Sequence, residues 1–175
     1  MATELDHLVV GTADLDAGTA WMEETLGVPA QGGGEHEAMG THNRIWRMGS
    51  AYIELIAVNP DVPAPPRKRW FGLDDHTVLG RLEQGPHLLT WVLRVDDLEA
   101  ALEAAPVSLG AVTELSRGDL RWKMAVPDDG ALHQDGHVPY LIQWLTPDPT
   151  TRQFTWFSAL ISASCQSPSS SPSLA

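Results

Sequence analysis

Two segments of this sequence carry residue types that take part in proton transfer or metal binding. The apolar run ELDHLVVG contains His7, and the apolar run AYIELIAV contains Glu54. Side chains alternate between the two faces of a strand, so in each run the more uniformly apolar face is expected to lie against a helix. His7 and Glu54 then face the other way. We therefore expect both side chains in the wall of a cavity and not in a sealed core.

Two later segments repeat these patterns with other polar residues. The run LLTWVLRV carries Thr90 in the place of His7, and the run YLIQWL carries Gln143 in the place of Glu54. The same alternation predicts that Thr90 and Gln143 face inward. Four equivalent strand positions are thus expected to surround one cavity.

A glycine-containing loop leads into the string MGTHNR, which holds His42 and Asn43. One interpretation is that these two residues cap a turn. The other is that they reach the cavity, where His42, with an ordinary pKa of about 6.5, would move a proton or replace a missing ligand. In GEHE, by contrast, His36 stands between two glutamates and is expected on the surface.

Two more strings contain candidates for contact with a small molecule. Trp70 ends RKRW, the densest basic run in the chain, and is expected to cover the mouth of the cavity. The basic residues before it either bind an anionic group or decorate a loop. Arg117, in SRGDLRW, either forks onto a carboxylate or phosphate, as guanidinium groups do, or pairs with Asp119 in a turn.

The elements that position these residues occur twice along the chain. Each first strand is followed by an Asp-Leu helix start, at Asp14 and at Asp97, where the carboxylate caps the first turn. Later pairs of strands match through the strings IWRM and RWKM. Three matched segments predict two strand–helix–strand–strand–strand modules. The predicted boundaries are 4–58 for the first module, 59–86 for a linker, 87–146 for the second module and 147–175 for an irregular serine-rich tail.

Composition narrows the classes of partner. The chain has 175 residues and a formal net charge of -12, which disfavours nucleic acid or an anionic membrane as the main partner. No apolar run approaches the roughly 20 residues of a membrane span, and the first residues lack the pattern of a signal peptide. A single cysteine, Cys165, excludes an intrachain disulfide. Cytoplasm is the expected compartment.

The repeated pattern His-Leu-Val-Val-x-x-x-Asp-Leu with a late Ile-Glu-Leu strand resembles the vicinal oxygen chelate superfamily. Within it, the strings GTHNRIWRMG, RWFGLDD and SRGDLRWKMAVPDDG resemble glyoxalase-like domain proteins. The resemblance covers residues 4–146. It implies an α+β fold in which two βαβββ modules form a cupped mixed sheet with helices outside. It also implies a small-molecule site and, by analogy, a homodimer.

In that superfamily the inward positions of the first and last strands of each module supply ligands to a divalent metal. Carried over, these positions are His7, Thr90, Glu54 and Gln143. Threonine departs from the pattern and glutamine is a weaker ligand than glutamate, so the implied ligand set is His7, Glu54 and Gln143. The metal would be iron, manganese, nickel or zinc.

Two functions follow from the resemblance. In the first, the protein is a metal-dependent lyase, isomerase or dioxygenase in which Glu54 or His42 moves a proton. In the second, it is a metal-free protein that binds or sequesters a small molecule such as a drug. In both, further contacts with the bound molecule are expected from Asn43, Trp70, Thr90, Arg117 and Gln143.

Overall fold

The computed structural model describes residues 3–147, and its strands form one eight-stranded sheet. The first module contains β1 (Thr3–Gly11), α1 (Leu15–Leu26), β2 (Gly32–His36), β3 (Thr41–Met48) and β4 (Ala51–Val58). The connection holds α2 (His76–Leu82). The second module contains β5 (His87–Val95), α3 (Leu98–Ala104), β6 (Ala111–Arg117), β7 (Leu120–Val126) and β8 (Tyr140–Trp144). The two predicted βαβββ modules are therefore present. Cys165 and nearly all of the predicted tail lie outside the described residues.

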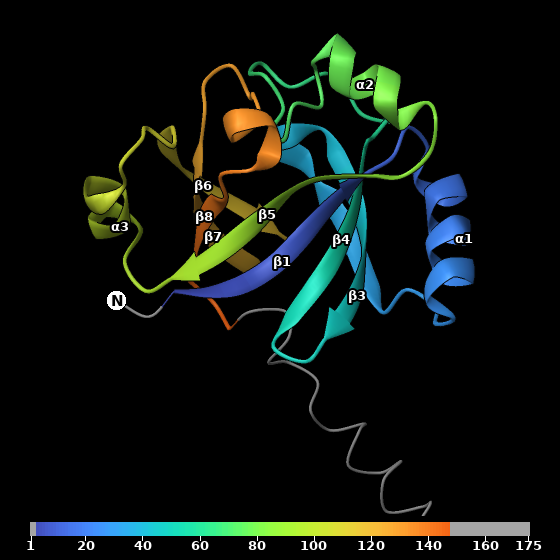
Figure 1. Cartoon of the computed structure of the whole chain (residues 1–175), viewed down its shortest axis with the longest axis horizontal. Helices are drawn as coiled ribbons and strands as arrows, with labels where there is room; N and C mark the ends of the chain where they lie inside the picture. Colours follow the sequence, from blue (N-terminus) through green and yellow to red (C-terminus); the bar gives the residue numbers. More distant parts are fainter. Residues whose placement is uncertain (1–2, 148–175) are drawn as a thin grey trace, which may run out of the picture.

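The two modules join through their first strands. The strand order is β2-β3-β4-β1-β5-β8-β7-β6, with β1 antiparallel to β5 and each first strand parallel to the last strand of its own module. The sheet curls until its edge strands β2 and β6 come into contact, which nearly closes it. Helices α1 and α3 lie outside the curled sheet (Figure 1). Residues far apart in the sequence therefore meet on its concave face.

Local sequence explains where the helices begin and end. The carboxylate of Asp14 accepts a hydrogen bond from Ala17 N at the start of α1, and Asp97 does the same for Ala100 N at the start of α3, as predicted. Gly27 ends α1 with φ of 70°, a left-handed conformation that glycine adopts without strain. Within residues 3–147 no helix has the length and apolar character needed to cross a membrane.

The core has an inner part and two outer parts. The outer parts lie under the helices, and Leu55 packs with α1 there while Leu141 packs with α3. The inner part fills the concave face with side chains of both modules and of the connection, among them Val9, Ile56, Phe71, Trp122, Met124, Tyr140 and Ile142. The concave face is therefore a packed interior, and any polar group in it needs a partner.

Candidate functional site

A bulge in β1 turns two consecutive polar residues into the interior. Leu5 pairs with Leu93 and His7 pairs with Val92, so Asp6 has no partner of its own in β5. Asp6 is 1% exposed and His7 is 3% exposed. The Nδ1–H of His7 donates to Asp6 Oδ1 at 2.7 Å, and Trp144 Nε1 donates to Asp6 Oδ2 at 2.8 Å. Strict alternation places Asp6 on the other face, and nothing in the sequence pattern marks the extra residue of a bulge.

Glu54, on the neighbouring strand β4, extends this chain of contacts. Its Oε2 is 3.4 Å from His7 Nε2, and its Oε1 accepts a hydrogen bond from Asn43 Nδ2. Asn43 Oδ1 in turn accepts from Arg117 Nη1 at 2.9 Å, which links β6 of the second module to β3 of the first. The structure therefore brings together His7, Asn43, Glu54 and Arg117.

The expected surface position of His36 is wrong. His36 is only 4% exposed, because β2 turns this side chain inward beneath Trp70 and Trp122, whose rings meet it edge-on at 5.0 and 6.1 Å. Its Nε2 lies 3.9 Å from Glu54 Oε1, and its Nδ1 lies 3.1 Å from the hydroxyl of Thr41. We call the set Asp6, His7, His36, Asn43, Glu54 and Arg117 the polar centre.

The charges of the polar centre follow from its burial and its contacts. Burial works to lower the pKa of His7, but hydrogen bonds to Asp6 and Glu54 raise it to about 9. Burial works to raise the pKa of Glu54, but the hydrogen bond and charge of His7 lower it to about 2. Burial also works to raise the pKa of Asp6, but the hydrogen bond and charge of His7 hold it below its ordinary value. Burial lowers the pKa of His36 to about 4. At neutral pH a buried imidazolium therefore sits between two carboxylates, beside a neutral imidazole.

Two predicted site residues lie elsewhere. His42 is half-buried on the opposite face of β3 from Asn43, near Arg44 and on the side of α1. Gln143 faces outward, where its Oε1 accepts a hydrogen bond from Leu98 N at the start of α3. The predicted roles of both residues in the cavity are therefore wrong.

The misplacement of Gln143 has a simple cause in the alignment of the two last strands. Tyr52 and Tyr140 are both buried and both face the interior, Tyr52 stacked on His7 and Tyr140 packed in the inner core. The strand register does not match these two tyrosines with each other. Val9 pairs with Glu54, and Val92, which takes the place of Val9 in the second module, pairs with Tyr140, so Glu54 corresponds to Tyr140, three residues before Gln143. Because strand side chains alternate, a shift by an odd number of residues exchanges an inward position for an outward one.

Two other predicted residues do lie on the inner face. Thr90 is 2% exposed, and its hydroxyl donates to the carbonyl of Gly136 at 3.3 Å. Trp70 is also 2% exposed and stacks on Phe71 over His36. Contact of either residue with a bound molecule stays a prediction.

The donor set does not fit the divalent metal that the superfamily implies. His7 is paired through both ring nitrogens, to Asp6 and to Glu54, whereas a metal needs a neutral imidazole with one nitrogen available. At the corresponding places the second module offers Thr90 and Tyr140, whose hydroxyls already donate to the carbonyls of Gly136 and Ala131. Within residues 3–147 no group of three or more histidine, cysteine, aspartate or glutamate side chains is placed to hold a metal ion.

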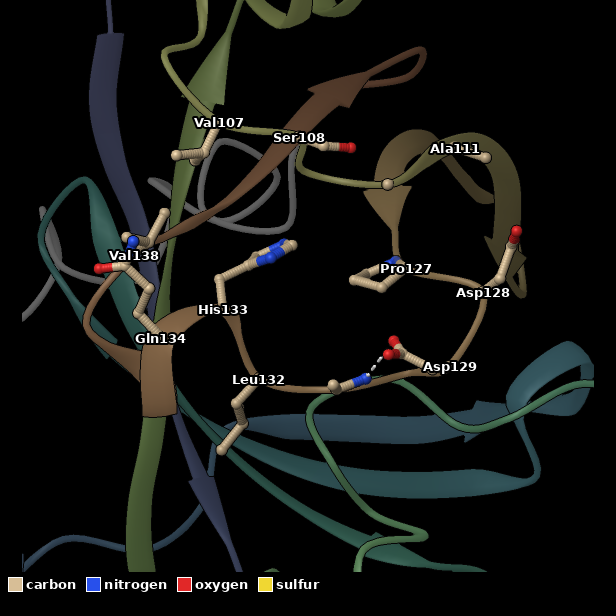
Figure 2. A pocket seen from close by; sticks show the side chains of 12 residues that line it. Val107, Ser108, Ala111, Pro127, Asp128, Asp129, Leu132, His133, Gln134 and Val138 are labelled. Carbon is tan, nitrogen blue, oxygen red and sulfur yellow. Dashed lines mark hydrogen bonds between the residues drawn. The ribbon is translucent and has the colours of Figure 1, made fainter.

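Two of the surface cavities differ in their relation to the polar centre. A cavity of about 790 Å³ in the second module is lined by Ser108, Asp128, Asp129 and His133 among others (Figure 2), and contains no residue of the polar centre. A groove of about 720 Å³ is lined by the glycines of β2 and by Arg117. Because Arg117 also bonds to Asn43, this groove adjoins the polar centre directly.

The fold is shared with solved structures. A hypothetical protein from Staphylococcus aureus aligns with a TM-score of 0.58 and 19% identity over 83% of this chain, which spans 59% of that protein. Methylmalonyl-CoA epimerase from Mycobacterium tuberculosis aligns with a TM-score of 0.50 and 22% identity, over 80% of this chain and 85% of the epimerase. A variant of the Streptomyces coelicolor epimerase with bound 2-nitronate-propionyl-CoA gives 0.54 and 18%, over 83% and 100% of the two chains. At these identities the likeness concerns the fold.

Among curated proteins, none matches this chain significantly. The family model of the glyoxalase-like domain, however, matches residues 5–164, which is most of the sequence. Together with the paired modules and the curled sheet, this match is decisive: the chain belongs to the glyoxalase-like domain family, within the vicinal oxygen chelate superfamily.

Proposed function

We propose that this protein binds a small molecule at the polar centre and catalyses a proton transfer on it, of the isomerase or lyase type. The observation that carries the proposal is a buried Glu54 held between His7 and Asn43, in a chain of contacts that ends at the groove beside Arg117. Buried titratable groups with strongly shifted pKa values are typical of catalytic sites. Epimerases with the same fold favour an isomerase chemistry.

Glu54 is the side chain that would accept the proton. In the free protein its pKa of about 2 makes it a weak base, because an effective general base has a pKa near the working pH. A ligand that displaces His7 or Asn43 removes the contacts that lower the pKa of Glu54 and leaves the burial that raises it. Binding would therefore strengthen the base, and His7, which carries a proton, would supply the acid.

No step of this proposal passes through a metal, because the donor set does not fit one. The imidazolium of His7 instead supplies the fixed positive charge beside Glu54. A cytoplasmic location and a homodimer stay predictions from the sequence.

The test is a thermal-shift screen of small carbonyl acids and their coenzyme A thioesters, followed by incubation of each hit in D2O. We expect deuterium to enter the position next to the carbonyl of at least one hit, as measured by NMR. The variant Glu54→Gln should still bind that hit but exchange it at least about 100-fold more slowly, the usual effect of losing a general base. Exchange at an unchanged rate in Glu54→Gln would contradict the proposal.

A second candidate is ligand binding without turnover. It is favoured by the resting state of Glu54, whose two oxygens are already in contact with Asn43 and with His7. On this hypothesis hits from the same screen bind tightly and no hit exchanges deuterium. The two functions therefore give opposite results in one experiment.

A further inference from the structure

Two indole N–H groups beside His36 have no hydrogen-bond acceptor. Trp70 is 2% exposed and Trp122 is 4% exposed, and the Nε1 atom of each is buried without a partner among the described residues. Three other indoles do have partners: Trp46 donates to Val28 O, Trp91 to His137 O and Trp144 to Asp6. A buried donor left unpaired costs about 1 to 3 kcal/mol. Two such donors in one place therefore need an explanation.

The polar centre does not supply the missing acceptor. Glu54 Oε1 accepts from Asn43 and Glu54 Oε2 faces His7. The oxygens of Asp6 face His7 and Trp144. The carboxylates in this part of the interior are therefore already engaged, while the indole donors are not.

Arg117 adds a cation to the same face. Leu115 pairs with Trp122 across β6 and β7, and Arg117 lies two residues beyond Leu115 on the same strand, hence on the same face. One nitrogen of its guanidinium donates to Asn43 Oδ1, and the side chain also lines the groove. Its stem packs on Gly34, where a Cβ atom would come within 2.9 Å of Arg117 Cδ. Arg117 thus separates the groove from the interior that contains the two indoles.

We propose that the interior beside His36 receives the oxyanion of a small-molecule ligand, a carboxylate or an enolate-type oxygen, with Trp70 and Trp122 as N–H donors and Arg117 as the cation. The indole nitrogen is a donor only, and a guanidinium matches a carboxylate with two parallel hydrogen bonds. An acceptor with several lone pairs and a negative charge therefore complements all three groups. This inference rests on the proposed function only in placing the ligand at the polar centre, and it names the chemical class of that ligand.

The indole N–H signals can be observed directly. The chain has 7 tryptophans, so protein labelled with ¹⁵N at the indole nitrogen gives one NMR signal for each, assigned through single Trp→Phe variants. The probes are acetate and pyruvate, with acetamide and pyruvamide as uncharged counterparts. We expect the anions to shift the signals of Trp70 and Trp122 downfield in a saturable manner. The signals of Trp46 and of the half-exposed Trp21 should not respond.

Variants then measure the contribution of each donor. Trp70→Phe, Trp122→Phe and Arg117→Gln are each expected to weaken pyruvate binding by about tenfold, which is the loss of one good hydrogen bond. Trp21→Phe is the matched control, since it makes the same change at an indole that is 47% exposed. Thermal unfolding of each variant shows whether it is folded at the temperature of the titration.

Three results would overturn the inference. The first is the absence of a saturable shift with either anion. The second is an equal response to the amides. The third is a pair of Trp70 and Trp122 signals that are already strongly hydrogen-bonded in the free protein. Deuterium exchange that is lost in Glu54→Gln while Trp70→Phe and Trp122→Phe bind normally would leave the proposed function standing without this ligand class. Anion binding at the two indoles with no deuterium exchange in any hit would support this ligand class and contradict the proposed proton transfer.

Discussion

The two modules have the same order of elements, yet their inner faces carry opposite chemistry. The first module places His7, Asn43 and Glu54 there, each no more than 5% exposed. The second places Val92, Met124 and Ile142 at comparable depth, along with Trp122. The second module shows that this fold packs its concave face well with apolar side chains. The fold therefore does not require the buried charges of the first module. Their presence favours a functional role.

The cost of these charges is offset by their pairing. A buried carboxylate or imidazolium is strongly unfavourable unless it is paired and hydrogen-bonded. In the first module each charged group has two partners, and His7 lies between Asp6 and Glu54. The charges of the polar centre can thus be buried together, and removal of one charged side chain leaves the remaining charges without a partner.

The largest effect is expected from His7→Gln, compared with Thr90→Val at the corresponding place in the second module. The first change leaves Asp6 and Glu54 as neighbouring buried carboxylates, and should lower the free energy of unfolding by about 3 to 5 kcal/mol. The second removes one hydrogen bond to Gly136 and should cost about 1 kcal/mol. Urea unfolding measures both. His87→Gln, at an exposed histidine, is the control. Equal costs for the two changes would refute the contrast between the modules.

A slightly smaller effect is expected from pH. His7 has a folded pKa of about 9 against an ordinary 6.5, so its stabilisation is complete below pH 6.5 and is lost as pH rises toward 9. Glu54, with a folded pKa of about 2 against 4.5, stabilises above pH 4.5 and loses this as pH falls toward 2. His36 is kept neutral, with a folded pKa of about 4, so stability also falls between pH 6.5 and 4.

The free energy of unfolding should therefore peak near pH 6.5 and fall on the alkaline side by on the order of 3 kcal/mol. Urea titrations at a series of pH values measure this curve. In His7→Gln the decline between pH 6.5 and 9 should disappear, because glutamine binds no proton in this range and no residue of the second module takes the role of His7. A decline of the same size in the variant would show that His7 is not its source.

How far the sequence predicts these features depends on strand regularity. The inward orientation of Glu54 and His7 was predictable because alternation holds between these residues and the ends of their strands, and Asp14 and Asp97 cap their helices as their residue type favours. The bulge at Asp6 breaks alternation. An error of three residues in aligning the last strands reversed the direction of Gln143.

His36 shows a different limit. Its sequence neighbours are glutamates, which are typical of a surface, but its burial comes from the closure of the sheet beneath Trp70 and Trp122. These rings belong to segments 34 and 86 residues further along the chain. Such long-range packing leaves no local signal in the residues around His36, so its place in the polar centre was visible only in three dimensions.

A smaller effect is expected at Gly34, where the second module reaches into the first. An added Cβ would meet Arg117 Cδ at 2.9 Å and Cγ at 3.2 Å, so Gly34→Ala should displace Arg117 from Asn43 and cost about 1 kcal/mol of stability. In an Arg117→Ala background, which lacks the Cγ and Cδ atoms, the same change should cost less, because the clash and the bond are both gone. Gly80→Ala is the control, since no atom lies within 4 Å of an added Cβ there. Identical costs in both backgrounds would exclude this contact.

The smallest effect is expected from metal removal, and it follows from the apolar inner face of the second module. A metal that binds the folded state at 100 times its Kd would add about 2.7 kcal/mol of stability, so its removal would be evident in the melting temperature. Because the hydroxyls of Thr90 and Tyr140 already donate to backbone carbonyls and do not complement His7 and Glu54 as ligands, untagged protein treated with EDTA should keep its melting temperature. Later addition of Fe(II), Mn(II), Ni(II) or Zn(II) should not raise it. Stoichiometric binding that disappears in His7→Gln and persists in His87→Gln would mean that the first module recruits a metal without help from the second, and that His7 gives up its proton to do so.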